Sequence, residues 1–122
     1  MAEEVERISA RRAPIRIPCS IPGHEEEYVI FKPDGWKFKH LRLWEDARGA
    51  AELAGVVAER IQEWRLLSED AQEIPFSPTR QIGEKILPNR TVFDDLPPDV
   101  AGWLTSSFRD AYVQAGRPSP NA

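Results

Sequence analysis

The residues of this chain with the clearest metal-binding chemistry are His24 and the three glutamates at 25–27. Imidazole and carboxylate groups bind zinc, manganese or iron in proteins. Adjacent residues seldom converge on one ion, however, and the second histidine, His40, stands among lysines. We therefore expect a solvated acidic turn at this position, with no metal ion and no cofactor.

Three pairs of adjacent carboxylates could carry acid-base chemistry if burial separated their pKa values. The pairs are Glu45-Asp46, Glu69-Asp70 and Asp94-Asp95. Each pair flanks the end of an expected helix or a turn, where acidic residues are structurally ordinary. The sequence shows no serine, histidine and aspartate constellation beside them, and its glycines are scattered singly, without a phosphate-binding loop. The lone Cys19 lies between Pro18 and Ser20 in a proline-rich segment and has no nearby histidine pair. These patterns predict no catalytic residues and a protein that is not an enzyme.

The four tryptophans are many for 122 residues. Such side chains serve either as core anchors or as hot spots of an interface. We expect the structural anchors to be Val57, Ile61, Trp64, Ile74, Pro75 and Leu104. The candidates for contact with a partner are Trp36, Phe38, Trp44, Trp103 and Phe108.

Charge and hydropathy narrow the class of partner. The 20 acidic residues outnumber the 16 basic ones, which gives a formal charge of -4, so nucleic acid is not the expected main partner. Basic residues still cluster locally and leave a basic face open as an alternative, at Arg7, Arg11, Arg12 and Arg16 and again at Lys37, Lys39, His40 and Arg42. No apolar run approaches the roughly 20 residues that span a bilayer, and the N-terminus is acidic where a signal peptide is basic. We expect a cytoplasmic protein without membrane contact.

The first elements along the chain are extended. Prolines at 14, 18 and 22 predict an extended arm over residues 1–23. The β-branched and aromatic residues at 27–32, followed by a Pro-Asp-Gly turn, predict a strand. Because a single strand needs a partner, we expect residues 15–18 to pair with it as a two-stranded ribbon.

Helices are expected to dominate the rest. Residues 36–67 contain no proline, and Leu53, Val56, Val57, Ile61 and Trp64 share one helical face. Gly49 predicts a break or kink near Arg48-Gly49. Ser77 and Pro78 then predict a short helix at 78–87.

The last helix is expected to begin at Pro97-Pro98 and to end at Gly116. The predicted fold is therefore mainly α: one helical domain of three to four helices over residues 24–116, with a strand at 27–32 and a disordered tail at 117–122.

One resemblance adds to this reading. The sequence resembles the tail assembly chaperones of long-tailed bacteriophages and prophages in two places. The first is the spacing of a valine, an isoleucine and a tryptophan before an acidic turn and an Ile-Pro step. The second is a later Leu-Pro-Pro-Asp-Val segment that starts a helix. The positions that carry it are Val57, Ile61, Trp64, Leu66, Glu69, Asp70, Ile74, Pro75, Leu96, Pro97, Pro98, Asp99 and Val100. The segment EYVIFKPDGWKFKHLR also looks like the strand and first helix of such proteins, and the similarity covers roughly residues 25–115. Similar proteins commonly have a glycine in the acidic turn, which this sequence lacks.

The resemblance implies a non-enzymatic chaperone. Such a protein binds and solubilises the tape-measure protein, helps to recruit tail-tube subunits, and self-associates. The alternatives are another phage structural or adaptor protein, such as a connector or minor tail component, and a small DNA-binding regulator that uses Lys37, Lys39 and Arg42.

Overall fold

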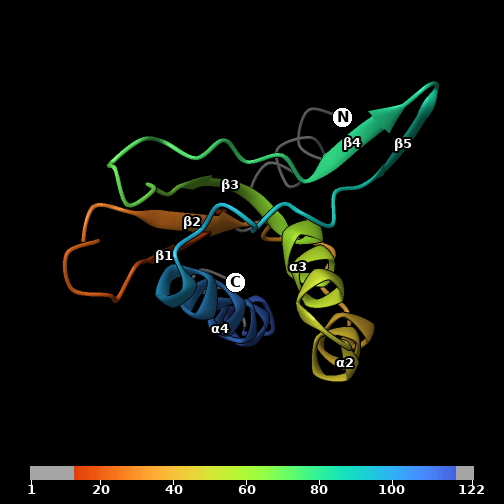
Figure 1. Ribbon diagram of the computed structural model, residues 1–122. Helices are drawn as coiled ribbons and strands as arrows, with labels where there is room; N and C mark the ends of the chain where they lie inside the picture. The colour runs from red at the N-terminus through yellow and green to blue at the C-terminus, as the bar shows by residue number, and fades with distance from the viewer. Residues whose placement is uncertain (1–12, 118–122) are drawn as a thin grey trace, which may run out of the picture.

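The computed structural model describes residues 13–117, which contain five strands and three helices. In chain order these are β1 (Ile15–Pro18), β2 (Tyr28–Phe31), α2 (Phe38–Asp46), α3 (Ala50–Glu59), β3 (Ile61–Arg65), β4 (Thr79–Ile82), β5 (Lys85–Pro88) and α4 (Pro98–Ala115). The first three strands form one antiparallel sheet, and β4 and β5 form a separate hairpin. In Figure 1, α4 lies along one face of the sheet, α3 and α2 stand beside its end, and the hairpin projects beyond α3. The mainly α prediction is therefore wrong, because the described residues form a mixed α/β fold.

The predicted pairing of residues 15–18 with the strand at 27–32 is confirmed. Ile15 lies opposite Phe31 and Ile17 lies opposite Val29 in antiparallel register. All four side chains are buried, and they share one face because alternate residues of a strand point to the same side. Phe31 meets Phe108 of α4 with ring centroids 6.5 Å apart, so this face is the one that α4 covers.

The third strand occupies the place where the sequence predicted the end of a long helix. The predicted helical face ran to Trp64, but α3 ends at Glu59 and β3 pairs with β2. Phe31 faces Ile61 and Ile30 faces Glu63, so Gln62 is an extra residue that makes a bulge in β3. The bulge brings Ile61 and Trp64, three positions apart, to the buried side. A spacing of three is also a helical spacing, which is why the pattern was misleading.

The predicted break at Gly49 and the predicted last helix are both present. Gly49 has a φ of +86° and separates α2 from α3, so the predicted break is confirmed. α4 starts with Pro98 in its first turn and ends at Gly116. Its buried face consists of Val100, Leu104, Ser107, Phe108, Ala111 and Ala115.

The short helix predicted at 78–87 is wrong, because these residues form the β4–β5 hairpin. Ile82 pairs with Lys85 across a two-residue turn, and Gly83 in that turn has a φ of +64°. A type II′ hairpin turn requires a positive φ at its first central residue, and glycine adopts it without steric cost. Pro78 and Pro88 lie beside or at the open end of the hairpin, where a missing backbone donor does not interrupt the ladder.

The acidic segment after β3 turns the chain back onto Trp64. The indole Nε1 of Trp64 donates to the carbonyl of Ile74 at 2.7 Å, and the amide of Ile74 donates to the carbonyl of Leu66 at 2.9 Å. At the tip of the turn, Ala71 has a φ of +61°. This is the left-handed conformation that a glycine would adopt readily. Because β3 precedes the turn and the hairpin follows it, the segment is a corner between strands.

Residues 1–12 of the predicted arm and residues 118–122 of the predicted tail lie outside the described residues. Among residues 13–117, no helix combines the length and the apolar character needed to cross a bilayer.

Candidate functional site

An apolar groove of about 710 Å³ lies between the α2–α3 pair and the open end of the β4–β5 hairpin. We call it the α3 groove. Its lining comprises Lys32, Lys39, His40, Leu43, Ala51, Glu52, Gly55, Val56, Ala58, Glu59, Ile61, Pro78, Thr79, Pro88 and Arg90. Most of the surface that these residues present to the groove is apolar. An exposed apolar concavity of this kind is typical of a binding surface.

The elements around the groove leave its apolar side chains open to solvent. α2 buries His40 against the rest of the fold, and Leu43, one turn further along, remains 41% exposed. α3 buries Ala54, Val57 and Ala58 on one side and turns Ala51, Glu52 and Gly55 toward the groove. α3 therefore serves two surfaces at once: Ala54 and Val57 face the core, Ala51 and Gly55 line the groove, and the buried Ala58 belongs to both.

Lys32, His40 and Glu59 of the groove lining belong to a charged cluster around Arg60. The guanidinium of Arg60 lies over the ring of Trp36, 4.7 Å from its centroid, and donates through Nη2 to the carbonyl of Asp34. Glu59 lies between two cations and an imidazole, with oxygens 3.9 Å from Lys32 Nζ, 3.8 Å from Arg60 Nη1 and 3.6 Å from His40 Nε2. This arrangement ties the turn after β2 to the end of α3.

Burial lowers the pKa of two members of this cluster, His40 and Arg60. Burial and, secondly, the positive charge of Arg60 lower the pKa of His40 below its usual value. His40 Nδ1 also accepts a hydrogen bond of 2.9 Å from the backbone amide of Lys37, at the start of α2. Burial likewise lowers the pKa of Arg60, whose Nε has no hydrogen-bond partner among the described residues. The chemistry of the cluster is that of a neutral imidazole held between fixed charges, in a structural position at the start of a helix.

The residues predicted to contact a partner fall into three environments. Trp36, Trp44 and Phe108 gather in one aromatic cluster between α2 and α4, with Phe108 centroids 5.2 Å from Trp36 and 5.9 Å from Trp44. Phe108 has no exposed surface, and Trp36 and Trp44 are half-buried. Trp103, on α4, is half-buried as well.

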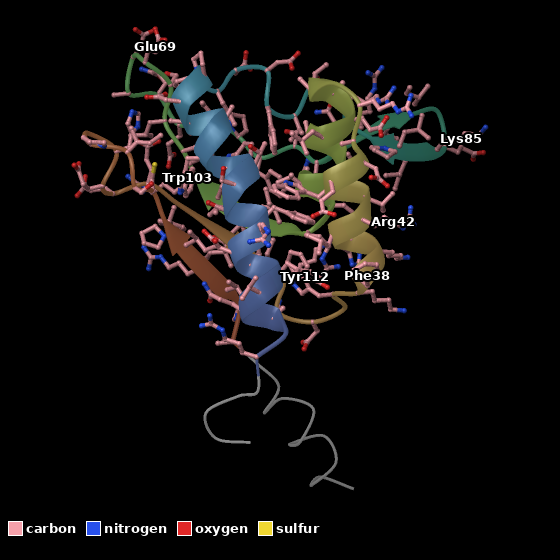
Figure 2. The ribbon with its side chains drawn as sticks, turned by 90° about the horizontal axis from the view of Figure 1, so that it is seen from below. Phe38, Arg42, Glu69, Lys85, Trp103 and Tyr112 are labelled. Carbon is pink, nitrogen blue, oxygen red and sulfur yellow. The ribbon has the colours of Figure 1, made fainter. Side chains whose placement is uncertain are left out.

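Phe38 is the predicted contact residue with the most open side chain, at 69% exposure. It lies beside Tyr112 at the lower end of α4 in Figure 2, and both line a hollow of about 320 Å³ together with Trp36 and Val113. This second surface is separate from the α3 groove in its lining residues.

The predicted structural anchors lie mostly in the core. Val57, Ile61, Trp64, Ile74 and Leu104 are all buried. Pro75 is the exception, because it is exposed.

The acidic turn at 24–27 differs from the solvated turn that the sequence predicted. Glu27 is buried and pairs with His24 Nδ1 through Oε2, and its Oε1 accepts a 2.9 Å hydrogen bond from the amide of Leu67. The pair holds the loop before β2 to the residues after β3. Within residues 13–117, no group of three or more histidine, cysteine, aspartate or glutamate side chains is placed to hold a metal ion.

The remaining chemical candidates are dispersed. The carboxylate pairs at 45–46, 69–70 and 94–95 are exposed. Cys19 is buried, and burial raises the pKa of its thiol, which disfavours the reactive thiolate.

Sequence reasoning missed the α3 groove and the apolar residues of the hairpin. Ile82, Ile86 and Leu87 are exposed on β4 and β5. The sequence did contain a signal for them, because Gly83-Glu84 separates two short segments without a helical apolar face. The capping pattern at Ser77-Pro78 outweighed that signal.

Comparison with known proteins adds no assignment, since the chain matches no protein-family model, no curated protein and no solved structure.

Proposed function

We propose that this chain is a tail assembly chaperone of a long-tailed bacteriophage or prophage, acting in the bacterial cytoplasm. In this role it binds exposed apolar segments of the tape-measure protein, keeps that protein soluble, and helps to recruit tail-tube subunits. It works as a binding protein, not as an enzyme, and it self-associates.

The observation that carries this proposal is the α3 groove, an open and mostly apolar surface between the α2–α3 pair and the hairpin. A chaperone must shield apolar side chains of its client from water without trapping them in a closed core. An amphipathic helix that lays its apolar face into such a groove buries that face by contact with side chains alone. Residues of the resemblance such as Trp64 and Val100 lie in the core, so they supply the scaffold and the groove supplies the contact.

The test is co-expression with the long, helix-rich protein encoded beside this chain. We expect the two proteins to co-purify and the soluble fraction of the client to rise, relative to the client alone and to the client with an unrelated small acidic protein. A client that precipitates equally in all three cases, with none of this chain attached, would contradict the proposal.

Purified virions separate the proposal from its main alternative. A chaperone leaves the finished particle, so the chain should be absent from virions by quantitative mass spectrometry. A stoichiometric amount would instead identify a structural or adaptor component of the particle.

A further inference from the structure

We propose that the α3 groove takes one specific kind of ligand: an amphipathic helix whose apolar stripe is flanked by acidic side chains. The inference rests on the proposed function only for the source of that helix, which would be the client protein. The shape, backbone chemistry and charge of the groove each support it.

The floor of the groove is shaped for close approach of another helix. Ala51, Gly55 and Ala58 are spaced four and three residues apart along α3, and all three line the groove. A Cβ built on Gly55 meets nothing within 4 Å, so the space above this position is open. Rows of small residues at this spacing form a shallow channel into which the side-chain ridge of a second helix can pack. Leu43 on α2 and Pro88 on the hairpin form the two apolar walls.

The backbone chemistry favours a helix over an extended segment as the ligand. The groove floor is a helix, whose interior amides and carbonyls are already paired with one another. An extended peptide laid on this floor would leave its own backbone groups without partners in an apolar channel, which is costly. A helix satisfies its backbone internally and presents only side chains.

Charge selects the flanks of that helix. The lining contains three basic residues, Lys32, Lys39 and Arg90, and two acidic ones, Glu52 and Glu59. Glu59 lies within 4 Å of Lys32, His40 and Arg60 nitrogens, so the charges of Glu59 and Lys32 largely compensate each other. Lys39 and Arg90 then remain against Glu52, which leaves the rim with a small excess of positive charge on a chain whose formal charge is -4.

Further basic residues are exposed on the elements that border the groove, although they do not line it. Arg42 is exposed on α2 and Arg80 on β4, whereas Lys85 flanks the turn at the far end of the hairpin, next to the exposed Glu84. Figure 2 shows Arg42 and Lys85 on the same side of the molecule, away from Glu69 of the acidic corner. Acidic flanks on a ligand helix would meet this rim with favourable charge, and basic flanks would meet it with repulsion.

The test measures binding of two synthetic helical peptides by fluorescence anisotropy. Both carry the same stripe of leucine and alanine, and they differ only in having glutamate or lysine at the flanking positions. We expect the glutamate peptide to bind at least about tenfold more tightly at low salt, since each of a few exposed ion pairs contributes a modest share. The preference should shrink as the salt concentration rises. Equal affinities at low salt would overturn the proposal.

A matched pair of variants locates the binding site. Gly55→Leu fills the groove floor, whereas Gly102→Leu adds the same side chain to α4, where a Cβ also meets nothing within 4 Å. Both glycines lie inside helices, so both substitutions improve helix propensity and both proteins should fold. We expect Gly55→Leu to weaken binding of the glutamate peptide at least about tenfold and Gly102→Leu to leave it unchanged. An unchanged affinity for Gly55→Leu would overturn the proposal.

A charge-reversal variant tests the role of the basic rim, and two further outcomes would show that the groove has a different occupant. The double variant Lys39→Glu, Arg90→Glu should favour the lysine peptide over the glutamate peptide. If Gly55→Leu instead converts an oligomer of this chain to a monomer while neither peptide binds the unaltered protein, the groove is an interface between copies and the proposal is wrong. It is equally wrong if peptide binding is gained only after residues 1–12 are removed, because that segment would then be the occupant.

These outcomes are separable from those of the proposed function. If the tape-measure protein co-purifies as well with Gly55→Leu as with the unaltered chain, the α3 groove is not the client-binding site, but the proposed chaperone function stands. Selective binding of the glutamate peptide with no co-purifying client would do the reverse.

Discussion

Trp64→Phe is the substitution that most directly tests how the acidic corner is held. The indole Nε1 donates to the carbonyl of Ile74 at 2.7 Å, and the ring lies 4.8 Å from Phe76 and 5.9 Å from Phe93 between centroids. Phenylalanine keeps an aromatic ring in these contacts but removes the donor and the five-membered ring. The change in stability therefore measures the loss of the hydrogen bond and of a small buried volume, while most of the aromatic packing is kept.

The expected loss follows from these two terms. A buried carbonyl left without a donor costs about 1–3 kcal/mol, and the void left by the smaller ring adds about 1 kcal/mol. We expect the free energy of unfolding to fall by about 2–4 kcal/mol, which is a large fraction of the ~5–15 kcal/mol typical of a domain. With the denaturant dependence usual for small proteins, the urea midpoint should fall by about 1–2 M.

The measurement is urea unfolding at 25 °C followed by far-ultraviolet circular dichroism, because tryptophan fluorescence changes with the substitution itself. Trp103→Phe is the control, since Trp103 is half-buried on α4 and should cost under about 1 kcal/mol. Amide hydrogen exchange should also show faster exchange at Ile74, whose amide donates to Leu66 across the corner. A loss below about 0.5 kcal/mol for Trp64→Phe, with exchange at Ile74 unchanged, would refute the view that Trp64 holds the corner.

Three further predictions concern backbone strain, pH and thiol chemistry. Ala71→Gly should raise the free energy of unfolding by about 0.5–1 kcal/mol, since Ala71 has a φ of +61° that glycine adopts without strain. The control, Ala51→Gly inside α3, should lower the free energy of unfolding. If urea titrations show that Ala71→Gly destabilises the protein, the backbone at Ala71 is not strained. The free energy of unfolding should fall as the pH drops through about 6.5 toward the depressed pKa of His40. The reason is that the unfolded state then binds the proton more readily than the buried imidazole does. His40→Gln should remove the part of this pH-dependent loss of stability that comes from His40. It should also lower the free energy of unfolding by about 1 kcal/mol at neutral pH, because the start of α2 is altered. If the pH dependence of stability is the same in His40→Gln, His40 is not its source. Cys19 should react with a disulfide reagent at least about tenfold more slowly in the folded protein than in urea, because burial raises the pKa of its thiol and covers it; equal rates would show that the thiol is accessible.

Several elements could be predicted because their signals are local. The ribbon of β1 and β2 follows from β-branched residues and a Pro-Asp-Gly turn, the break at Gly49 from a glycine between two apolar runs, and α4 from a proline start and a glycine stop. In each case the residues that specify the element lie within it or next to it.

The errors arose where pairing at a distance overrode a local pattern. Ile61 and Trp64 have the spacing of a helix, but β2 offers a partner edge and the bulge at Gln62 reconciles that spacing with a strand. Helix propensity is a weak preference that such tertiary pairing readily exceeds. Residues 78–87 carried both a helical cap and a hairpin turn, and Gly83 decided between them.

The candidate site was even less accessible from the sequence. The aromatic residues chosen as partner contacts include Phe108, which α4 buries against Trp36 and Trp44. The α3 groove is lined instead by small or aliphatic residues such as Ala51, Gly55 and Leu43. These residue types are common throughout proteins, so they do not indicate a binding surface in a sequence.

The sequence by itself determined the extended ribbon, the two breaks in the chain at Gly49 and Gly116, and the role of Trp64 as a core residue, since each depends on conformational limits or hydrophobicity of nearby residues. Only the tertiary structure decided that Trp64 lies on a strand and donates to Ile74, and that an open apolar groove with a basic rim separates α3 from the hairpin. Such features depend on which distant segments meet, and the free energy of those contacts is set by burial and pairing across the whole fold.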